Sequence, residues 1–176
     1  MVKLAAGSTY TPLATTTLGS TQSTITFSSI PSTYTDLIII GSWFRVTTSG
    51  NNLGMRLNSD TGTNYSNTNL EGNGSSAGSG RNSNDTYARI GAIQNGYTAS
   101  STESLPIIIH LNNYSNTTTY KSILSRYNQA SSVSGAAVAL WRSTSAITTI
   151  DLAAFSPGTG QFGSGSTFTL YGIASA

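Results

Sequence analysis

The residues with the clearest potential for chemistry are the acids and the single histidine of the chain. Asp60-Thr61-Gly62 matches the catalytic triplet of aspartic proteases, in which two such loops place carboxylates side by side to share a proton. Only one copy occurs, and it follows Asn58-Ser59 rather than an apolar strand that would hold the loop rigid. Because Asp side chains readily bond the backbone two residues on, the triplet predicts an Asx turn between strands.

His110 is the only histidine, and a catalytic triad would need a serine and an acid to meet it across the fold. The chain has no cysteine, and one imidazole with dispersed carboxylates does not supply the ligands that zinc requires. We therefore predict no catalytic activity, no metal site and no obligatory cofactor. His110 is expected to be a hydrogen-bonded structural or interface residue.

The charges are few for a chain of 176 residues, with six carboxylates against eight Lys and Arg residues. The cations are dispersed along the chain, which argues against a stripe that tracks the phosphates of a nucleic acid. A glycine spacing like that of the dinucleotide fingerprint occurs at residues 158–163, but a strand rather than a helix is expected to follow it. No apolar run approaches the roughly 20 residues of a membrane span, and no secretion signal is apparent.

Tyrosine and tryptophan provide the more interesting side chains, because both residue types favour subunit interfaces and sugar platforms. Trp43 and Trp141 lie in apolar runs and are expected in the core or at an interface. The predicted partner-contact residues stand next to polar loops or in the N-terminal segment: Tyr10, Leu13, Leu18, Tyr65, Tyr97, Tyr114 and Tyr127.

Short apolar or alternating runs, separated by Gly, Asn and Ser, predict the strands that position these residues. The expected strands cover residues 25–27, 37–40, 53–57, 87–93, 105–111, 120–127, 134–141, 147–152 and 168–171. The apolar run at 37–40 is expected to be covered on both faces or to lie near a sheet centre. Residues 71–85 have no apolar side chain larger than Ala77 and are predicted to form a long exposed loop.

This pattern predicts an all-β fold, a jelly-roll-type β-sandwich with a short N-terminal arm. Residues 1–20 are expected to form the arm or an edge strand, and residues 21–176 the jelly-roll β-sandwich domain.

Four segments resemble, in the same order, blocks of small virion proteins of tailed phages, notably phages of cyanobacteria and other aquatic bacteria. They are ITFSSIPSTYTDL at 25–37, RLNSDTGTNYS at 56–66, ITTIDL at 147–152 and GSTFTLYG at 165–172. The resemblance extends over about residues 13 to 173 and implies a jelly-roll module used as capsid cement or decoration, or as part of a tail fibre. Ser59 departs from it, since glycine is expected at that place in the turn.

The composition independently favours an assembly protein. Charged residues, especially lysines, usually protect the edges of β-sheets, and two lysines are too few for a whole sandwich. Burying the edges against sister subunits is an alternative, so we predict a homo-oligomer, a trimer or a dimer.

We therefore predict a phage virion structural protein, a capsid cement or decoration protein that stabilises the shell. Its expected partners are sister subunits and the major capsid protein, on the capsid surface rather than the tail. The alternative is a tail-fibre or receptor-binding module that recognises host surface glycan. A glycan-cleaving enzyme would need two carboxylates about 5 to 9.5 Å apart, and no pair close in sequence suggests one.

Overall fold

The computed structural model describes residues 9–43, 53–91, 103–154 and 161–174, which form strands and turns but no helix. Twelve strands occur among them: β1 (Tyr10–Thr17), β2 (Thr24–Phe27), β3 (Asp36–Trp43), β4 (Leu53–Leu57), β5 (Tyr65–Gly72), β6 (Ala77–Asp85), β7 (Ala88–Gly91), β8 (Leu105–Leu111), β9 (Lys121–Gln129), β10 (Val133–Trp141), β11 (Ile150–Ala154) and β12 (Thr167–Ile173). The prediction of an all-β protein is confirmed. The part of the chain that the structure describes holds no helix with the length and apolar character of a membrane span.

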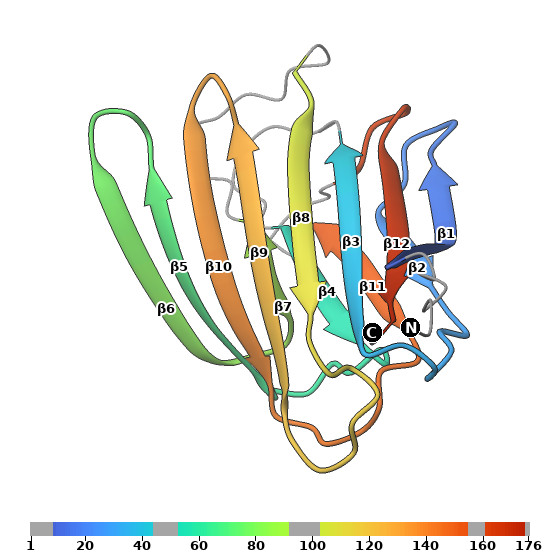
Figure 1. Cartoon of the computed structure of the whole chain (residues 1–176). Helices are drawn as coiled ribbons and strands as arrows, with labels where there is room; N and C mark the ends of the chain where they lie inside the picture. The colour runs from blue at the N-terminus through green and yellow to red at the C-terminus, as the bar shows by residue number, and fades with distance from the viewer. Residues whose placement is uncertain (1–8, 44–52, 92–102, 155–160, 175–176) are drawn as a thin grey trace, which may run out of the picture.

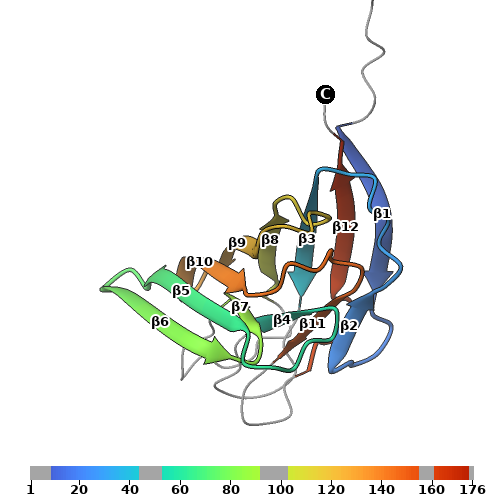
Figure 2. The ribbon, with the colours of Figure 1, turned by 90° about the horizontal axis from the view of Figure 1, so that it is seen from below.

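The strands form two antiparallel sheets that face one another, as expected of a β-sandwich (Figure 1). The larger sheet has eight strands in the order β1-β12-β3-β8-β9-β10-β5-β6, and the smaller has four in the order β2-β11-β4-β7. Figure 2 shows that the large sheet extends past the small one, so that the β5–β6 hairpin projects beyond it. One face of the large sheet therefore points to the small sheet, and no described strand covers the opposite face.

The core lies between the two sheets, and alternating burial in the strands produces it. In β9, Ile123 and Tyr127 are buried, whereas Leu124 between them is exposed. Strands β8 and β10 show the same alternation, because successive side chains of a strand point to opposite faces. From the small sheet, Met55 and Ile150 contribute fully buried side chains.

The apolar run at residues 37–40 is covered on both faces over only part of its length. Leu37, Ile38 and Ile39 are buried, as predicted, but Ile40 is 44% exposed. Ile40 lies on the face of β3 that points away from the small sheet, so cover on both faces fails at this residue. The alternative expectation was a place near a sheet centre, and β3 lies inside the large sheet, between β12 and β8.

Residues 71–85 do not form the predicted long loop. They include the end of β5, a four-residue turn and all of β6, which pairs antiparallel with β5 from Gly72↔Ala77 to Tyr65↔Asp85. In the turn, the side-chain oxygen of Asn73 accepts hydrogen bonds from the backbone N–H groups of Ser75 and Ser76. The prediction failed because β6 is an edge strand with little burial on either face, so it needs no apolar alternation.

Residues 10–17 form an edge strand, which is one of the two alternatives expected for the N-terminal segment. Strand β1 pairs with β12 from Tyr10↔Ile173 to Thr17↔Thr167, and the Thr17 and Thr167 hydroxyls lie 2.9 Å apart across the pair. Leu18, directly after β1, is buried in the core. Removing residues 1–18 would therefore take away a paired strand as well as any contact with a partner.

The turn at Asn58-Ser59 explains why glycine is the expected residue at position 59. Asn58 has φ +51° and Ser59 has φ +54°, and the backbone N–H of Asp60 donates to the carbonyl of Leu57. Glycine adopts these left-handed angles without steric cost. Here the Ser59 hydroxyl donates to the Asp151 carboxylate at 3.0 Å, which offsets part of that cost.

We expect Gly41→Ala to destabilise the fold by about 1–3 kcal/mol, because a Cβ there overpacks the core. The added atom would lie 2.6 Å from Cε1 of the buried Phe168. The free energy of unfolding, measured with urea, tests this. Gly78→Ala in β6 is the matched control, since its Cβ meets no atom within 4 Å and should change stability by less than about 0.5 kcal/mol. Equal stability of the two variants would contradict the close packing of Gly41 against Phe168.

Candidate partner-binding surface

The outer face of the large sheet carries most of the exposed large apolar side chains of the described residues. Five of the seven lie there, on β3, β5, β9 and β10: Ile40, Leu70, Leu124, Val138 and Leu140. We call these five residues the outer patch. Leu124 lies directly opposite Val138, and Leu70 opposite Ala136, so the patch crosses neighbouring strands. Contiguous apolar patches on a protein surface commonly mark interaction sites.

An arginine without a partner stands within the outer patch. Arg126 of β9 is exposed and lies between Ile108 of β8 and Ala136 of β10 in register. Arg81, on the edge strand β6, lies opposite Thr68. Among the described residues, no hydrogen bond or ion pair engages either guanidinium group.

The carboxylates, in contrast, are all engaged within the chain. Asp36 accepts a hydrogen bond from Asn113, Asp60 from Trp141, Glu71 from Tyr127, Asp85 from Arg89, Glu103 from Ser131 and Asp151 from Thr26. Asp36 is the acid that begins β3, four residues before Ile40 and therefore about 13 Å along the strand. The free cations of the outer face thus have no free carboxylate beside them.

A shallow groove of about 440 Å³ runs across the outer face beside Arg126. The side chains on its outer-face positions are Pro106, Ile108, Arg126, Asn128, Ser134 and Ala136. A second hollow of about 250 Å³ shares Asn128 and Ser134 and continues to the β5–β6 turn at Asn73 and Gly74. The groove combines apolar walls with hydrogen-bond donors.

The outer face of the small sheet has a different character, because its polar groups pair with one another. Thr26 donates to Asp151 at 2.7 Å, and the Arg56 Nε donates to the carbonyl of Thr86 at 3.1 Å. Its exposed positions carry none of the exposed large apolar side chains of the described residues. The large sheet is therefore the better candidate for binding a partner.

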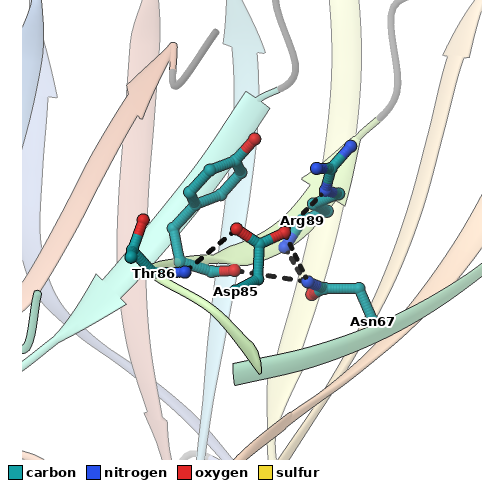
Figure 3. A network of polar contacts seen from close by, with 5 residues as sticks. Asn67, Asp85, Thr86 and Arg89 are labelled. Atoms are coloured by element: carbon teal, nitrogen blue, oxygen red, sulfur yellow. Dashed lines mark hydrogen bonds and ion pairs between the residues drawn. The ribbon is translucent and has the colours of Figure 1, made fainter. Parts of the chain in front are cut away.

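A polar network fixes the projecting part of the large sheet to the small one (Figure 3). Asn67 of β5 is buried; its side-chain oxygen accepts from the backbone N–H of Arg89 at 2.7 Å, and its Nδ2 donates to Asp85 at 3.3 Å. Arg89 forms an ion pair with Asp85 at 2.9 Å, and Asp85 also accepts the backbone N–H of Thr86. The network joins β5, β6 and β7, so the hairpin that carries Leu70 is held in place.

Three of the tyrosines predicted to contact a partner are buried. Tyr65 and Tyr114 are fully buried and Tyr127 is 8% exposed, so the expectation that their rings lie at the surface is wrong. Each adjoins a polar loop in sequence, but its ring turns toward the core. Trp141 is also buried, as expected for a core residue.

The remaining predicted contact residues differ in exposure. Tyr10 is 49% exposed and packs edge-on against Tyr171 at the β1 edge. Leu13 is half-buried against the core, and Leu18 is buried. Tyr97 lies outside the described residues, and so does the side chain of Trp43.

The sequence contained a signal for the outer patch that the prediction did not use. Residues 107–109 and 138–140 are runs of three consecutive apolar residues. Successive side chains of a strand point to opposite faces, so at least one side chain of each run must point away from the core. In β9, Ile123 and Leu124 are likewise consecutive apolar residues. Apolar residues on both faces of neighbouring strands therefore predict an apolar surface on the outer face of the sheet.

Of the residues considered for catalysis, Asp60 has a structural role, and His110 lies on the outer face of the large sheet. Asp60 forms the predicted Asx turn, since its Oδ1 accepts the backbone N–H of Gly62 at 2.8 Å. Partial burial raises the pKa of Asp60, but hydrogen bonds from Trp141, Asn64 and Gly62 outweigh it and hold the pKa below its ordinary value. His110 lies on the outer face of β8 opposite Leu124.

One further motif lacks the context that chemistry needs. Residues 74–78 have the Gly-x-Ser-x-Gly spacing of a nucleophile elbow, but they run from the β5–β6 turn into β6, and no helix follows. The described residues hold no group of three or more potential metal ligands.

The sequence matches no protein-family model and no curated protein.

Buried Tyr65 provides a test of this packing at alkaline pH. Burial raises the pKa of Tyr65 to about 12, and its hydroxyl oxygen accepts the backbone N–H of Leu57 at 3.0 Å. In the unfolded chain the phenol ionises near pH 10, so the unfolded state binds fewer protons above that pH. The stability that neutral Tyr65 contributes is therefore complete below pH 10 and declines as the pH rises toward 12.

We expect Tyr65→Phe to lose about 1–3 kcal/mol at pH 7, because the N–H of Leu57 is left unpaired. The difference from the wild type should narrow between pH 10 and pH 11, measured by urea unfolding. Tyr120→Phe, at a ring that is 54% exposed, is the control and should change stability at pH 7 by less than about 0.5 kcal/mol. A difference that stays constant with pH would contradict the role of Tyr65.

Proposed function

We propose that this protein is a phage virion structural protein, a capsid cement or decoration protein that stabilises the shell. The observation that carries the proposal is the outer patch with its unpaired Arg126, on a chain whose own carboxylates are all engaged. Such a face is suited to binding another protein. The sequence resemblance to small virion proteins of tailed phages indicates which assembly that is.

The strand pairing supports a jelly roll. Without the hairpins β5–β6 and β9–β10, eight strands remain, and they pair in a nested order: β1 with β12, β2 with β11, β3 with β8 and β4 with β7. An antiparallel ribbon nested in this way and rolled into two four-stranded sheets is a jelly roll, an architecture common in capsid proteins. The two hairpins widen one sheet and supply much of the outer patch.

We further propose that the protein is a homo-oligomer, a trimer or a dimer. Lys121, the one lysine among the described residues, is 1% exposed at the start of β9 and protects no sheet edge. The edge strand β6 is nine residues long and contains neither lysine nor proline. An edge of this kind favours cover by a neighbouring subunit.

The alternative, a tail-fibre or receptor-binding module, would recognise glycan through exposed Tyr and Asn side chains. Tyr65, Tyr114 and Tyr127 are buried and cannot stack on a sugar, whereas Tyr10 is 49% exposed at the β1 edge.

Labelling intact particles of the phage that encodes this protein, with gold-conjugated antibody and electron microscopy, tests the location. We expect label on the capsid surface, because the outer patch needs an extended protein surface to cover it. Particles of a deletion strain, lacking the gene, provide the control for specificity. Label confined to tails, or absent from particles, would refute the capsid role.

Light scattering of the purified protein tests the oligomer. We expect a mass of three or two times 18.3 kDa, because the β6 edge otherwise stays uncovered. A monomer at high protein concentration, with no contact between copies in the particle, would contradict it.

A further inference from the structure

We propose that the groove beside Arg126 binds an apolar segment of the shell protein through a carboxylate on that segment. This inference rests on the proposed capsid role and adds which surface of the chain makes the contact and what chemistry it recognises.

Three hydrogen-bonding side chains line this groove on neighbouring strands. Arg126 and Asn128 are two residues apart on β9 and so lie on the same face, and Ser134 of β10 lies opposite Asn128. The planar guanidinium offers a fork of N–H donors that matches the two oxygens of a carboxylate. The amide and the hydroxyl can donate to the same group or to the backbone beside it.

The other side chains that line the groove are mostly apolar, so they favour a partner segment with apolar residues beside its carboxylate. Pro106 and Ile108 border the groove on β8, and Ala136 lies on its β10 side. Beyond them stand Leu124 and Val138 of the outer patch. A segment that covers these side chains removes water from around Arg126, and the charge pair then strengthens.

The charge distribution argues that this carboxylate comes from a different protein. An acid of a second copy would have to share or give up a hydrogen bond to meet Arg126, since each of the six side-chain carboxylates accepts one within its own chain. Two copies packed face to face about a two-fold axis would also bring two unpaired Arg126 side chains to one interface.

Other classes of partner fit the face less well. Within the described ranges, two unpaired arginines, Arg126 and Arg81, are too few for a surface that binds nucleic acid along its phosphates. The outer patch is aliphatic and provides no aromatic platform for a sugar ring. A protein segment that carries both apolar side chains and an acid satisfies the whole surface.

Binding of the full-length protein to capsids assembled without it tests the proposal. We expect Arg126→Glu to bind at least about thirtyfold more weakly than the wild type, the loss typical of breaking a desolvated charge pair. Arg81→Glu is the matched control, because it makes the same change in net charge on the same sheet but outside the groove. Arg81 lies on β6, the proposed edge between copies, so light scattering must also show that this variant keeps the wild-type oligomer. It should bind within about threefold of the wild type, as expected of a charge at the rim of an interface.

A second variant tests the groove without changing charge. Ala136→Phe places a ring in the groove and should also weaken capsid binding, while urea unfolding shows that the variant remains folded. Unchanged binding of both Arg126→Glu and Ala136→Phe to capsids that bind the wild type would overturn the groove and leave the capsid role standing. If Arg126→Glu and Arg81→Glu weakened capsid binding equally, the loss would come from the change in net charge alone, and the groove proposal would also be overturned.

Two further outcomes show which kind of molecule supplies the acidic group, and whether the groove or the capsid role itself has failed. Displacement of the protein from capsids by millimolar glucuronate, or Arg126-dependent binding to vesicles containing phosphatidylglycerol, would assign the groove to a sugar or a lipid and overturn a protein partner. Wild-type protein that does not bind capsids at all would refute the proposed function, and the groove proposal with it.

Discussion

The packing of the small sheet on the large one determines where every side chain of the large sheet points. Met55 and Leu57 of β4, with Ile150 and Leu152 of β11, are completely buried in this contact. Because side chains alternate along a strand, burying one set commits the other set to the opposite face. The outer patch and the groove at Arg126 are therefore consequences of the core.

Few charges are present, and the chain uses its acids as acceptors that hold loops and strands together. Asp60, in the turn after β4, accepts a hydrogen bond from the indole N–H of Trp141, and Glu71 accepts one from the buried hydroxyl of Tyr127 at 2.6 Å. Amide side chains act in the same way, as where Asn116 accepts the backbone N–H groups of Thr118 and Thr119. Arg126 of the outer face is outside this scheme, which makes it available to a partner.

Much of the fold could be predicted from local patterns. Strands such as β8, β9 and β10 have alternating or continuous apolar residues and flanking turn residues, and both signals are local. The Asx turn at Asp60 was likewise predictable from its own side chain. The β5–β6 hairpin was not, because β6 gains its stability from hydrogen bonds to β5 rather than from burial of its own side chains.

The sequence by itself determined the all-β class and most of the strands. Only the tertiary structure decided which tyrosines are buried, since Tyr65 and Tyr114 border polar loops but face the core. It also created the candidate site, by placing residues 106–108, 126–128 and 134–136 side by side on three neighbouring strands. Sequence order carries no direct record of that register, because pairing between strands depends on the sheet as a whole.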